Sequence, residues 1–584
     1  MKKTLLTLAA CLLGAASAVA LNPSTVNNQL IYHLSPDGNW AGAEDFYAGT
    51  VSAYNIVTGQ TWTQEIKNEA EQLHLGVGNS VSNYGTILYS RSMDCTDAYY
   101  AKKGVQYKLP KPKDFTCAWA NGITGDESVI VGAGGYSMYN SEVSPDPYVF
   151  PLVWRLQSDG KYGEPEILEY PMKDYQGLVP QTVCVDCVSG DGRTISGQIV
   201  ACDGMLCQNV VWTCDDQGKW SYYILGEELY HPEGMEYPGP APVGHYPNET
   251  DFMDEDKKAE YLAELAYYSD HWMEGYPCPN YEDYLTADQL AAYEAACYAY
   301  QFEGDPTQQE IDQQEWLDWA AKNDAFFAAV PTFDMNSCML SDNGVFFATA
   351  NLKDGFDGTA CDAYLFNLPL NTYDVKKKGV VYPDAVGNNG TVLAHEIQAW
   401  GAVPPVEKIY IAKADGGFEL LQDYMNENHP AIYDWMKENV VHDFEGEAYN
   451  PETGEDEPYS IKDVWFIGRP RINADETVIS TWIENVWNPT DNDYYISRVM
   501  PLPGFVGIEN ITNDIANGMS VSMDRNGLIT INGEASALNV YDLNGRLVLN
   551  VQNPGATVKT DLTNGSYIIK AEGNNVQAVA KAIR

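Results

Sequence analysis

Carboxylates and amides recur in this sequence at positions where they could form a ring. Seven short segments run from an apolar residue through an Asp-, Asn- or Gly-rich turn into an apolar stretch: residues 34–42, 81–90, 123–132, 188–197, 340–349, 386–395 and 472–481. Carboxylates that converge on one axis could supply the acid and the base of glycoside hydrolysis. Tight turns require the same residues, because Asp and Asn bond their own backbone and Gly supplies positive φ. The sequence favours the turn interpretation.

Motifs for several other chemistries are missing. The sequence contains no metalloprotease HExxH, nucleophile-elbow GxSxG, phosphate-loop or EF-hand pattern, and its eight histidines are scattered. His395 precedes Glu396, but no second His follows at the spacing that zinc needs. A surface protease is therefore disfavoured, and the catalytic residues, if there are any, stay unknown.

Aromatic residues gather between residues 272 and 319. They could form a platform on which sugars stack, and they are Trp272, Trp316, Trp319, Tyr298 and Tyr300. At helical spacing, aromatic side chains more commonly pack inward as a core. We expect a core.

One acidic run offers the oxygen ligands that calcium prefers: Asp251, Asp254, Glu255 and Asp256. The run precedes a helical segment, where solvated acidic residues are favoured by the helix dipole. No cofactor is predicted, and the sequence leaves calcium binding open.

The chain has 12 cysteines, of which Cys11 lies in a predicted signal peptide. Cys202 and Cys207 flank a four-residue hairpin connection, which predicts a disulfide between them. Cys184 and Cys187 form a CxxC that leads into a strand, whereas redox CxxC motifs begin helices. A zinc site made of these four thiolates is a weaker alternative.

The seven turn segments define a repeat. The turn positions are residues 38, 85, 127, 192, 344, 390 and 476, and the shorter intervals between them match a propeller blade of about 40–50 residues. About 16–27 residues after each turn comes an aromatic within another apolar run, as at Trp154 and Trp212. Each unit thus offers about four short strands, which is the content of one blade.

Composition limits the class of protein and the partners that this chain can have. Residues 1–20 of the 584 read as a secretory signal, with Lys2 and Lys3, an apolar run and small residues before a cut after Ala20. The formal net charge of −48 argues against nucleic acid or an anionic membrane as a partner. No later stretch approaches the length of a membrane span.

Two long insertions interrupt the repeats. Residues 226–333 carry 24 Asp and Glu against 3 Lys and begin with a Pro- and Gly-rich loop. Helices are predicted over 256–273, 286–302 and 307–329, the last two opened by capping boxes. A second insertion, near 418–463, is predicted to hold a helix over 431–441 and an acidic loop over 445–460.

The segment 504–584 alternates short strands with Gly and Asn turns, which predicts a small β-sandwich. Residues 538–548 (LNVYDLNGRLV), 562–570 (LTNGSYIIK) and Lys581 closely resemble the C-terminal sorting domain of the type IX secretion system of Bacteroidetes. The motif residues are Tyr541, Asp542, Gly545, Arg546, Gly565, Tyr567, Lys570 and Lys581. The resemblance implies passage through the outer membrane by the type IX machinery.

The repeats also resemble extracellular HAF-type repeats and, more loosely, TolB-type propeller repeats. Ser35-Pro36-Asp37-Gly38 and Ser189-Gly190-Asp191-Gly192 carry this resemblance. It implies a propeller over residues 21–503, and propellers serve enzymes and binding proteins alike.

We therefore expect a mainly β protein: a β-propeller of about seven blades with an α-helical insertion, followed by a C-terminal β-sandwich. The leading hypothesis is a secreted or cell-surface protein of binding or structural type, whose partner is a glycan or an extracellular protein. The alternative is an extracellular carbohydrate-active enzyme, a glycoside hydrolase or lyase, with loop carboxylates at the propeller axis.

Overall fold

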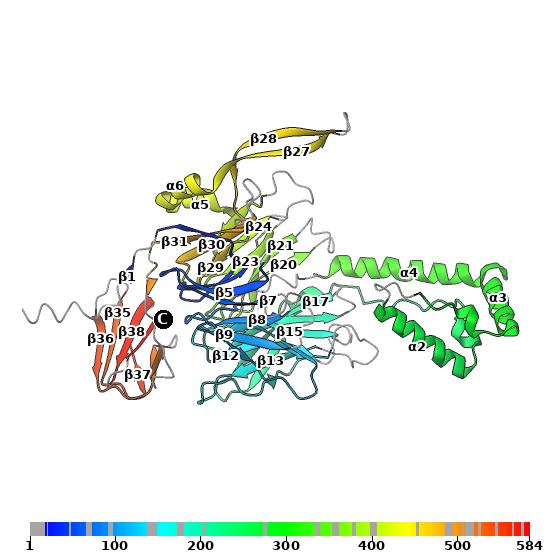
Figure 1. Cartoon of the computed structure of the whole chain (residues 1–584), viewed down its shortest axis with the longest axis horizontal. Coiled ribbons are helices and arrows are strands. Elements are labelled where there is room, and N and C mark those ends of the chain that lie inside the picture. Colours follow the sequence, from blue (N-terminus) through cyan, green and yellow to red (C-terminus); the bar gives the residue numbers. More distant parts are fainter. Residues whose placement is uncertain are drawn as a thin grey trace, which may run out of the picture. The chain divides into compact units, whose positions relative to one another are not determined.

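The structure is a computed structural model of the full chain (Figure 1). It describes residues 18–19, 22–45, 48–65, 73–91, 97–136, 149–171, 180–201, 206–271, 277–331, 333, 339–352, 361–376, 381–396, 406–450, 455–484, 495–503, 505, 507–508, 519–523, 527–542, 547–562, 566–573 and 577–583. The chain divides into two compact units, His231–Val330 and the remainder.

Seven four-stranded antiparallel blades make up the propeller, as the repeats predict. The first four contain β3 (Leu30–Leu34), β4 (Trp40–Asp45), β5 (Thr50–Asn55) and β6 (Thr61–Gln64); β7 (Leu73–Leu75), β8 (Ile87–Arg91), β9 (Ala98–Lys102) and β10 (Val105–Lys108); β11 (Cys117–Ile123), β12 (Val129–Gly135), β13 (Val149–Arg155) and β14 (Glu166–Ile167); and β15 (Thr182–Val188), β16 (Thr194–Ala201), β17 (Leu206–Cys214) and β18 (Trp220–Ile224). One parallel bridge, Val149 to Thr182, joins the third blade to the fourth.

The other three blades follow the helical insertion. They contain β19 (Met339–Leu340), β20 (Phe346–Leu352), β21 (Cys361–Asn367) and β22 (Thr372–Lys376); β23 (Val381–Val386), β24 (Val392–Glu396), β25 (Ile409–Ala412) and β26 (Glu419–Leu420); and β29 (Arg471–Ile472), β30 (Val478–Glu484), β31 (Tyr495–Pro501) and β2 (Ser24–Asn27). The fourth strand of the last blade is therefore N-terminal, with Ser24 opposite Val499 and Asn27 opposite Ile496. This pairing closes the ring with strands from both ends of the propeller segment.

Each blade contains one of the predicted turns between its first two strands. The central position has a left-handed backbone in all seven: Gly38, Gly85, Glu127, Gly192, Gly344, Gly390 and Glu476, with φ between 59° and 78°. In each turn this residue donates its N–H to the carbonyl three residues earlier, as Gly38 does to Ser35. A left-handed φ costs Gly little conformational energy and costs Glu more. The two Glu residues therefore need contacts that compensate for this cost.

Apolar side chains fill the space between neighbouring blades. Val129 and Val153 of the third blade pack with Val183 and Trp212 of the fourth, and all four are buried. The indole N–H of Trp212 donates to the carbonyl of Glu169 at 2.7 Å. The aromatic that follows a turn is here a core residue whose indole N–H has a hydrogen-bond partner.

The unit His231–Val330 is helical, with α2 (Glu255–His271), α3 (Ala287–Phe302) and α4 (Gln308–Ala329), drawn in green in Figure 1. Both predicted capping boxes are present, Thr286 with Gln289 and Thr307 with Glu310. Within the described part of the chain, no helix is long and apolar enough to cross a membrane.

The second insertion differs from expectation. Its helices are α5 (Leu421–Asn428) and α6 (Pro430–Asn439), and most of the expected acidic loop forms a long hairpin of β27 (Val441–Asn450) and β28 (Glu455–Trp465). Phe444 and Ile461 pair directly across it, so apolar residues at its base stabilise the hairpin despite its acidic composition.

The C-terminal segment is a sandwich of two sheets. One contains β33 (Ser520–Met523), β34 (Leu528–Asn532) and β37 (Thr557–Lys559); the other contains β35 (Ala537–Asp542), β36 (Leu547–Gln552), β38 (Ser566–Glu572) and β39 (Gln577–Ile583). Val521, Ile529, Val540 and Ile569 share its core. A short pair, β1 (Ala18–Val19) with β32 (Gly507–Ile508), includes residues of the predicted signal peptide.

Candidate functional site

The turn carboxylates bond their own turns. Asp191 accepts hydrogen bonds from the hydroxyl of Ser189 at 2.6 Å and from the backbone N–H of Arg193 at 3.0 Å. Asp37 accepts in the same way from Ser35 and Asn39. These are the contacts of turn structure, and they leave the two carboxylates engaged in holding the chain.

The turns also contact one another around the ring. The N–H of Asp37 donates to the side chain of Asn83, that of Gly190 to the carbonyl of Asp342, and that of Ala474 to the carbonyl of Pro36. The last of these joins the seventh blade to the first. We call the seven turns together the turn ring: residues 35–39, 82–86, 124–128, 189–193, 341–345, 387–391 and 473–477.

The two glutamates in the turn ring lock neighbouring blades together. Glu127 accepts hydrogen bonds from Ser82 at 2.9 Å and from Thr86 at 2.6 Å, both in the preceding blade, and pairs with Lys102. Glu476 accepts in the same manner from Thr391 at 2.6 Å and lies 3.6 Å from the Nζ of Lys413. These contacts offset the cost of the left-handed backbone.

The first strands of four blades carry a β-bulge, and a polar or aromatic residue occupies each one. The bulge residues are Tyr32, Asn121, Asp186 and Asp384. Bulges commonly re-aim side chains next to active sites. The two acids among them, Asp186 and Asp384, are therefore the carboxylates to test against the catalytic alternative.

Asp384 belongs to a buried network that joins three blades. One carboxylate oxygen lies 2.6 Å from Nδ1 of His395, and the other accepts from Arg471 at 3.2 Å. Arg471 also donates to the carbonyl of Tyr32 in the first blade. Burial alone would raise the pKa of Asp384, but His395 and Arg471 outweigh it and hold the pKa below its ordinary value.

Asp186 is buried between blades. Gly78 lies so close that a Cβ there would approach the carbonyl oxygen of Asp186 to 1.7 Å. Burial raises the pKa of Asp186 to about 7, and its Oδ2 has no hydrogen-bond partner among the described residues. Asp186 and Asp384 are 7% and 5% exposed, which is too little for an acid that must reach a polymeric substrate. The two carboxylates therefore support the catalytic alternative poorly.

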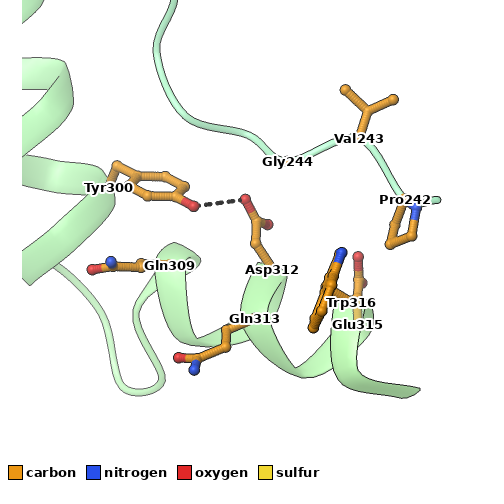
Figure 2. A pocket seen from close by; sticks show the side chains of 9 residues that line it. All are labelled: Pro242, Val243, Gly244, Tyr300, Gln309, Asp312, Gln313, Glu315 and Trp316. Atoms are coloured by element: carbon orange, nitrogen blue, oxygen red, sulfur yellow. Dashed lines mark hydrogen bonds between the residues drawn. The ribbon is translucent and has the colours of Figure 1, made fainter. Parts of the chain in front are cut away.

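A more accessible site lies in the helical unit. A pocket of about 410 Å³ opens between the Pro- and Gly-rich loop and helices α3 and α4 (Figure 2). Its lining residues are Pro242, Val243, Gly244, Tyr300, Gln309, Asp312, Gln313, Glu315 and Trp316. We call it the Trp316 pocket. Its volume lies at the lower end of the ~300–1,000 Å³ of ligand sites and suits a single side chain or sugar.

Asp312 is held in place in this pocket by several neighbouring groups. It accepts from Tyr300 at 3.0 Å, as Figure 2 shows, from Gln308 at 2.8 Å, and from the backbone N–H of His245, whose ring nitrogen lies 2.7 Å away. The His245 N–H, helped by Gln308 and Tyr300, holds the pKa of Asp312 well below its usual range. The contacts tie the loop to α4 and give the pocket a preformed shape.

The expectation that the aromatic residues form a core is wrong for several of them. Trp316 is 51% exposed and Tyr298 is 60% exposed. Trp319 is half-buried and donates its indole N–H to the carbonyl of Gly239. Trp272 lies outside the described residues. The side chains that do fill the core of this unit include Phe326 and Tyr293.

A second pocket, of about 530 Å³, lies where the fourth and fifth blades meet. Backbone-rich turn residues such as Gly344 line it together with Leu368, Pro369 and the acids Glu227 and Glu228. It presents no side chain held in place as Asp312 is, so we rank it below the Trp316 pocket.

No metal site emerges from the described part of the chain, in which no three His, Cys, Asp or Glu side chains are grouped to hold an ion. Of the residues considered for calcium, Asp254 accepts from Gln289 at 3.1 Å and Asp251 lies 3.8 Å from Lys258. These contacts fit the interpretation of a solvated acidic run.

The predicted disulfide stays a prediction, because Cys202 lies outside the described residues. Cys207 is buried in β17, where it faces Val200. Burial raises the pKa of Cys187 to about 12 and that of Cys184 further. Both shifts disfavour the thiolates that a zinc site needs.

The described motif residues of the sorting-domain resemblance fall on three adjacent strands. Tyr541 and Asp542 end β35, where Asp542 faces Tyr567 of β38. Lys581 of β39 faces Ile568, and Lys570 pairs with Glu572 at 2.6 Å. The remaining motif residues lie outside the described part: Gly545, Arg546 and Gly565.

Comparisons with known proteins find distant structural similarities. The chain is similar to virginiamycin B lyase from Staphylococcus aureus (10% identity, 82% of this chain and 99% of that chain, TM-score 0.33) and to the Dos1 propeller (7%, 82% and 94%, 0.36). It is also similar to TolB from Acinetobacter baumannii (9%, 68% and 62%, 0.30). No family model matches the sequence, and no curated protein is significantly similar to it. The seven blades described above define a β-propeller protein, and these distant similarities carry no information on its activity.

Proposed function

We propose that this is a secreted or surface-displayed β-propeller protein of binding type, exported by the type IX secretion system, whose binding site lies on the helical insertion. The propeller serves as the scaffold. One observation carries the binding proposal: the Trp316 pocket combines an exposed indole with a carboxylate that four contacts hold in place.

The export proposal has a separate basis. It depends on the predicted signal peptide at residues 1–20 and on the resemblance of residues 504–584 to type IX sorting domains. Strands that carry the motif pair in one sheet of a compact sandwich, which is compatible with recognition of this segment as a folded module.

Binding is tested with the purified mature chain, residues 21–584, on arrays of glycans, peptides and extracellular proteins, read for retention and for product release. We expect retention without turnover. It should weaken at least tenfold in Trp316→Ala and stay unchanged in Leu317→Ala, a neighbour on α4 that is similarly exposed, at 47%, and lies outside the pocket. Product release by the wild-type protein would favour the carbohydrate-active enzyme instead.

Export is tested by fractionating a Bacteroidetes host that expresses the full-length chain. We expect it at the cell surface or in the medium, and retained in the periplasm when a type IX component is deleted or the chain ends at residue 503. Surface delivery in the secretion mutant would contradict the export proposal and leave the binding proposal untouched.

A further inference from the structure

The Trp316 pocket has charges of one sign only. Its nine lining residues include two acids, Asp312 and Glu315, and no Lys or Arg. The oxygens of Asp312 are already engaged by protein donors, whereas the exposed carboxylate of Glu315 has no ion-pair partner within the described chain. A bound group can therefore meet one unpaired carboxylate at close range, with Asp312, which the ring of His245 contacts, behind it.

An indole stands beside these carboxylates. Trp316 follows Glu315 on α4 and lines the same pocket (Figure 2), with Pro242 and Val243 as an apolar wall opposite. Among aromatic side chains, tryptophan attracts a cation to its ring face most strongly, and Arg is the more common partner. An exposed indole next to an unpaired carboxylate thus offers both the face and the counter-charge that a planar guanidinium uses.

The surrounding unit reinforces this preference at long range. Residues 231–330 contain 22 Asp and Glu and 3 Lys. Of the described acids in this range, all except Glu249 and Asp312 are exposed. Such a surface raises the local concentration of cations and repels anions, whereas it contributes nothing to the encounter with a neutral sugar.

We propose that the Trp316 pocket binds the guanidinium or ammonium group of a basic protein segment, with the cation stacked on Trp316 and paired with Glu315. This inference rests on the proposed function, since it names the ligand of the same site. Exposed apolar side chains elsewhere on the unit, such as Tyr298 and Phe302 at 60% and 64%, would contact apolar residues of the same partner.

The test is isothermal titration of the mature chain with three probes: the peptide (Arg-Gly)₃, its citrulline analogue, and a neutral oligosaccharide. Citrulline keeps the shape of arginine without its charge. We expect saturable binding of the arginine peptide, at least tenfold weaker in Trp316→Ala, several-fold weaker in Glu315→Gln, and unchanged in Leu317→Ala. Raising the salt to 1 M should weaken it further, because the Debye length falls to about 3 Å.

Three outcomes would overturn the inference: equal affinity for the citrulline peptide, equal losses in Trp316→Ala and Leu317→Ala, or no binding of the arginine peptide. Trp316-dependent, salt-insensitive binding of the oligosaccharide would also overturn it, yet would keep the proposed binding function. Failure of that function is a different result, namely no Trp316-dependent ligand on any array.

Discussion

The acidic side chains that join blades of the propeller are held by neighbouring donors, whereas the described acids of the helical insertion mostly face solvent. Glu127 accepts from two hydroxyls and a lysine of the adjacent blade, and Asp384 joins a histidine to an arginine. Among the described acids of the insertion, Asp312 has comparable engagement, and neighbours such as Glu315 and Asp318 are exposed.

The contrast separates scaffold from binding surface. A side chain whose hydrogen bonds hold two blades together is not available to bind a ligand. The turn ring and the Asp384 network are therefore poor ligand sites. Exposed aromatic side chains that gather on one surface commonly mark a contact site for a partner. We therefore expect substitutions in the propeller to change the free energy of unfolding and substitutions at the Trp316 pocket to change binding.

Arg471→Met should have the largest effect, a loss of about 3–5 kcal/mol of unfolding free energy. It removes one partner from a buried pair and leaves the charge of Asp384 without its guanidinium. Arg469→Met is the matched control: its side chain is 42% exposed and pairs with Glu407, so its loss should stay below about 1 kcal/mol. Equal losses in denaturant titrations would refute the three-blade network.

Glu127→Ala should cost about 2–3 kcal/mol. The change leaves the hydroxyls of Ser82 and Thr86 without their acceptor in a buried setting. Asp191→Ala, which breaks contacts only within its own turn, should cost about 1 kcal/mol, and the midpoint of urea unfolding distinguishes the two. A larger loss at Asp191 would mean that the turns, rather than the contacts between blades, limit stability.

The pH dependence of stability should come partly from His33, on the first strand of the first blade. Burial, with a smaller contribution from Arg471, lowers its pKa to about 3. Between pH 6.5 and 3 the unfolded state binds a proton there that the folded state does not, so stability falls as pH falls. From pH 6.5 to 5 the His33 contribution should be about 2 kcal/mol, at 1.36 kcal/mol per pKa unit.

The measurement is the difference in unfolding free energy between wild type and His33→Gln at the two pH values. No change in that difference would mean that the histidine is not buried neutral. His245 in the insertion should behave in the opposite sense, because its hydrogen bond to Asp312 raises its pKa. Its stabilising effect is present at low pH and is lost as pH rises through that raised pKa.

The smallest effect on stability should follow Trp316→Ala, below about 0.5 kcal/mol, because the indole is half exposed. Phe326→Ala, on the same helix and 1% exposed, should cost about 3–5 kcal/mol. Thermal melts of the two variants compare them directly. A large loss in Trp316→Ala would assign the indole to the core and weaken its role in binding.

Local patterns allowed much of the propeller to be predicted from the sequence. Each blade repeats one turn, and even Glu127 and Glu476, which replace Gly, adopt its left-handed backbone because contacts to the preceding blade compensate. The closure of the ring by β2 could not be predicted, since Ser24 and Val499 pair across almost the whole chain without a local signal.

The Trp316 pocket could not be predicted from the sequence for a related reason. Its shape depends on His245 meeting Asp312, 67 residues apart, and helical spacing alone cannot tell which aromatic faces inward. The sequence offers Trp316 as part of a sugar-stacking platform but favours a core position, which is wrong because the side chain is 51% exposed. Acidic composition likewise suggested a loop over 445–460, where cross-strand pairing of β27 with β28 prevails.

The most direct test of the division between scaffold and binding surface is hydrogen–deuterium exchange of the mature chain with and without saturating (Arg-Gly)₃ peptide. We predict slower exchange confined to residues 239–246 and 308–317, around the Trp316 pocket. The first strands of the blades, from β3 to β29, should exchange at the same rate in both samples. Slower exchange centred on those strands or on the turn ring, with the insertion unchanged, would contradict the assignment of the binding site to the Trp316 pocket. It would favour a site at the propeller axis.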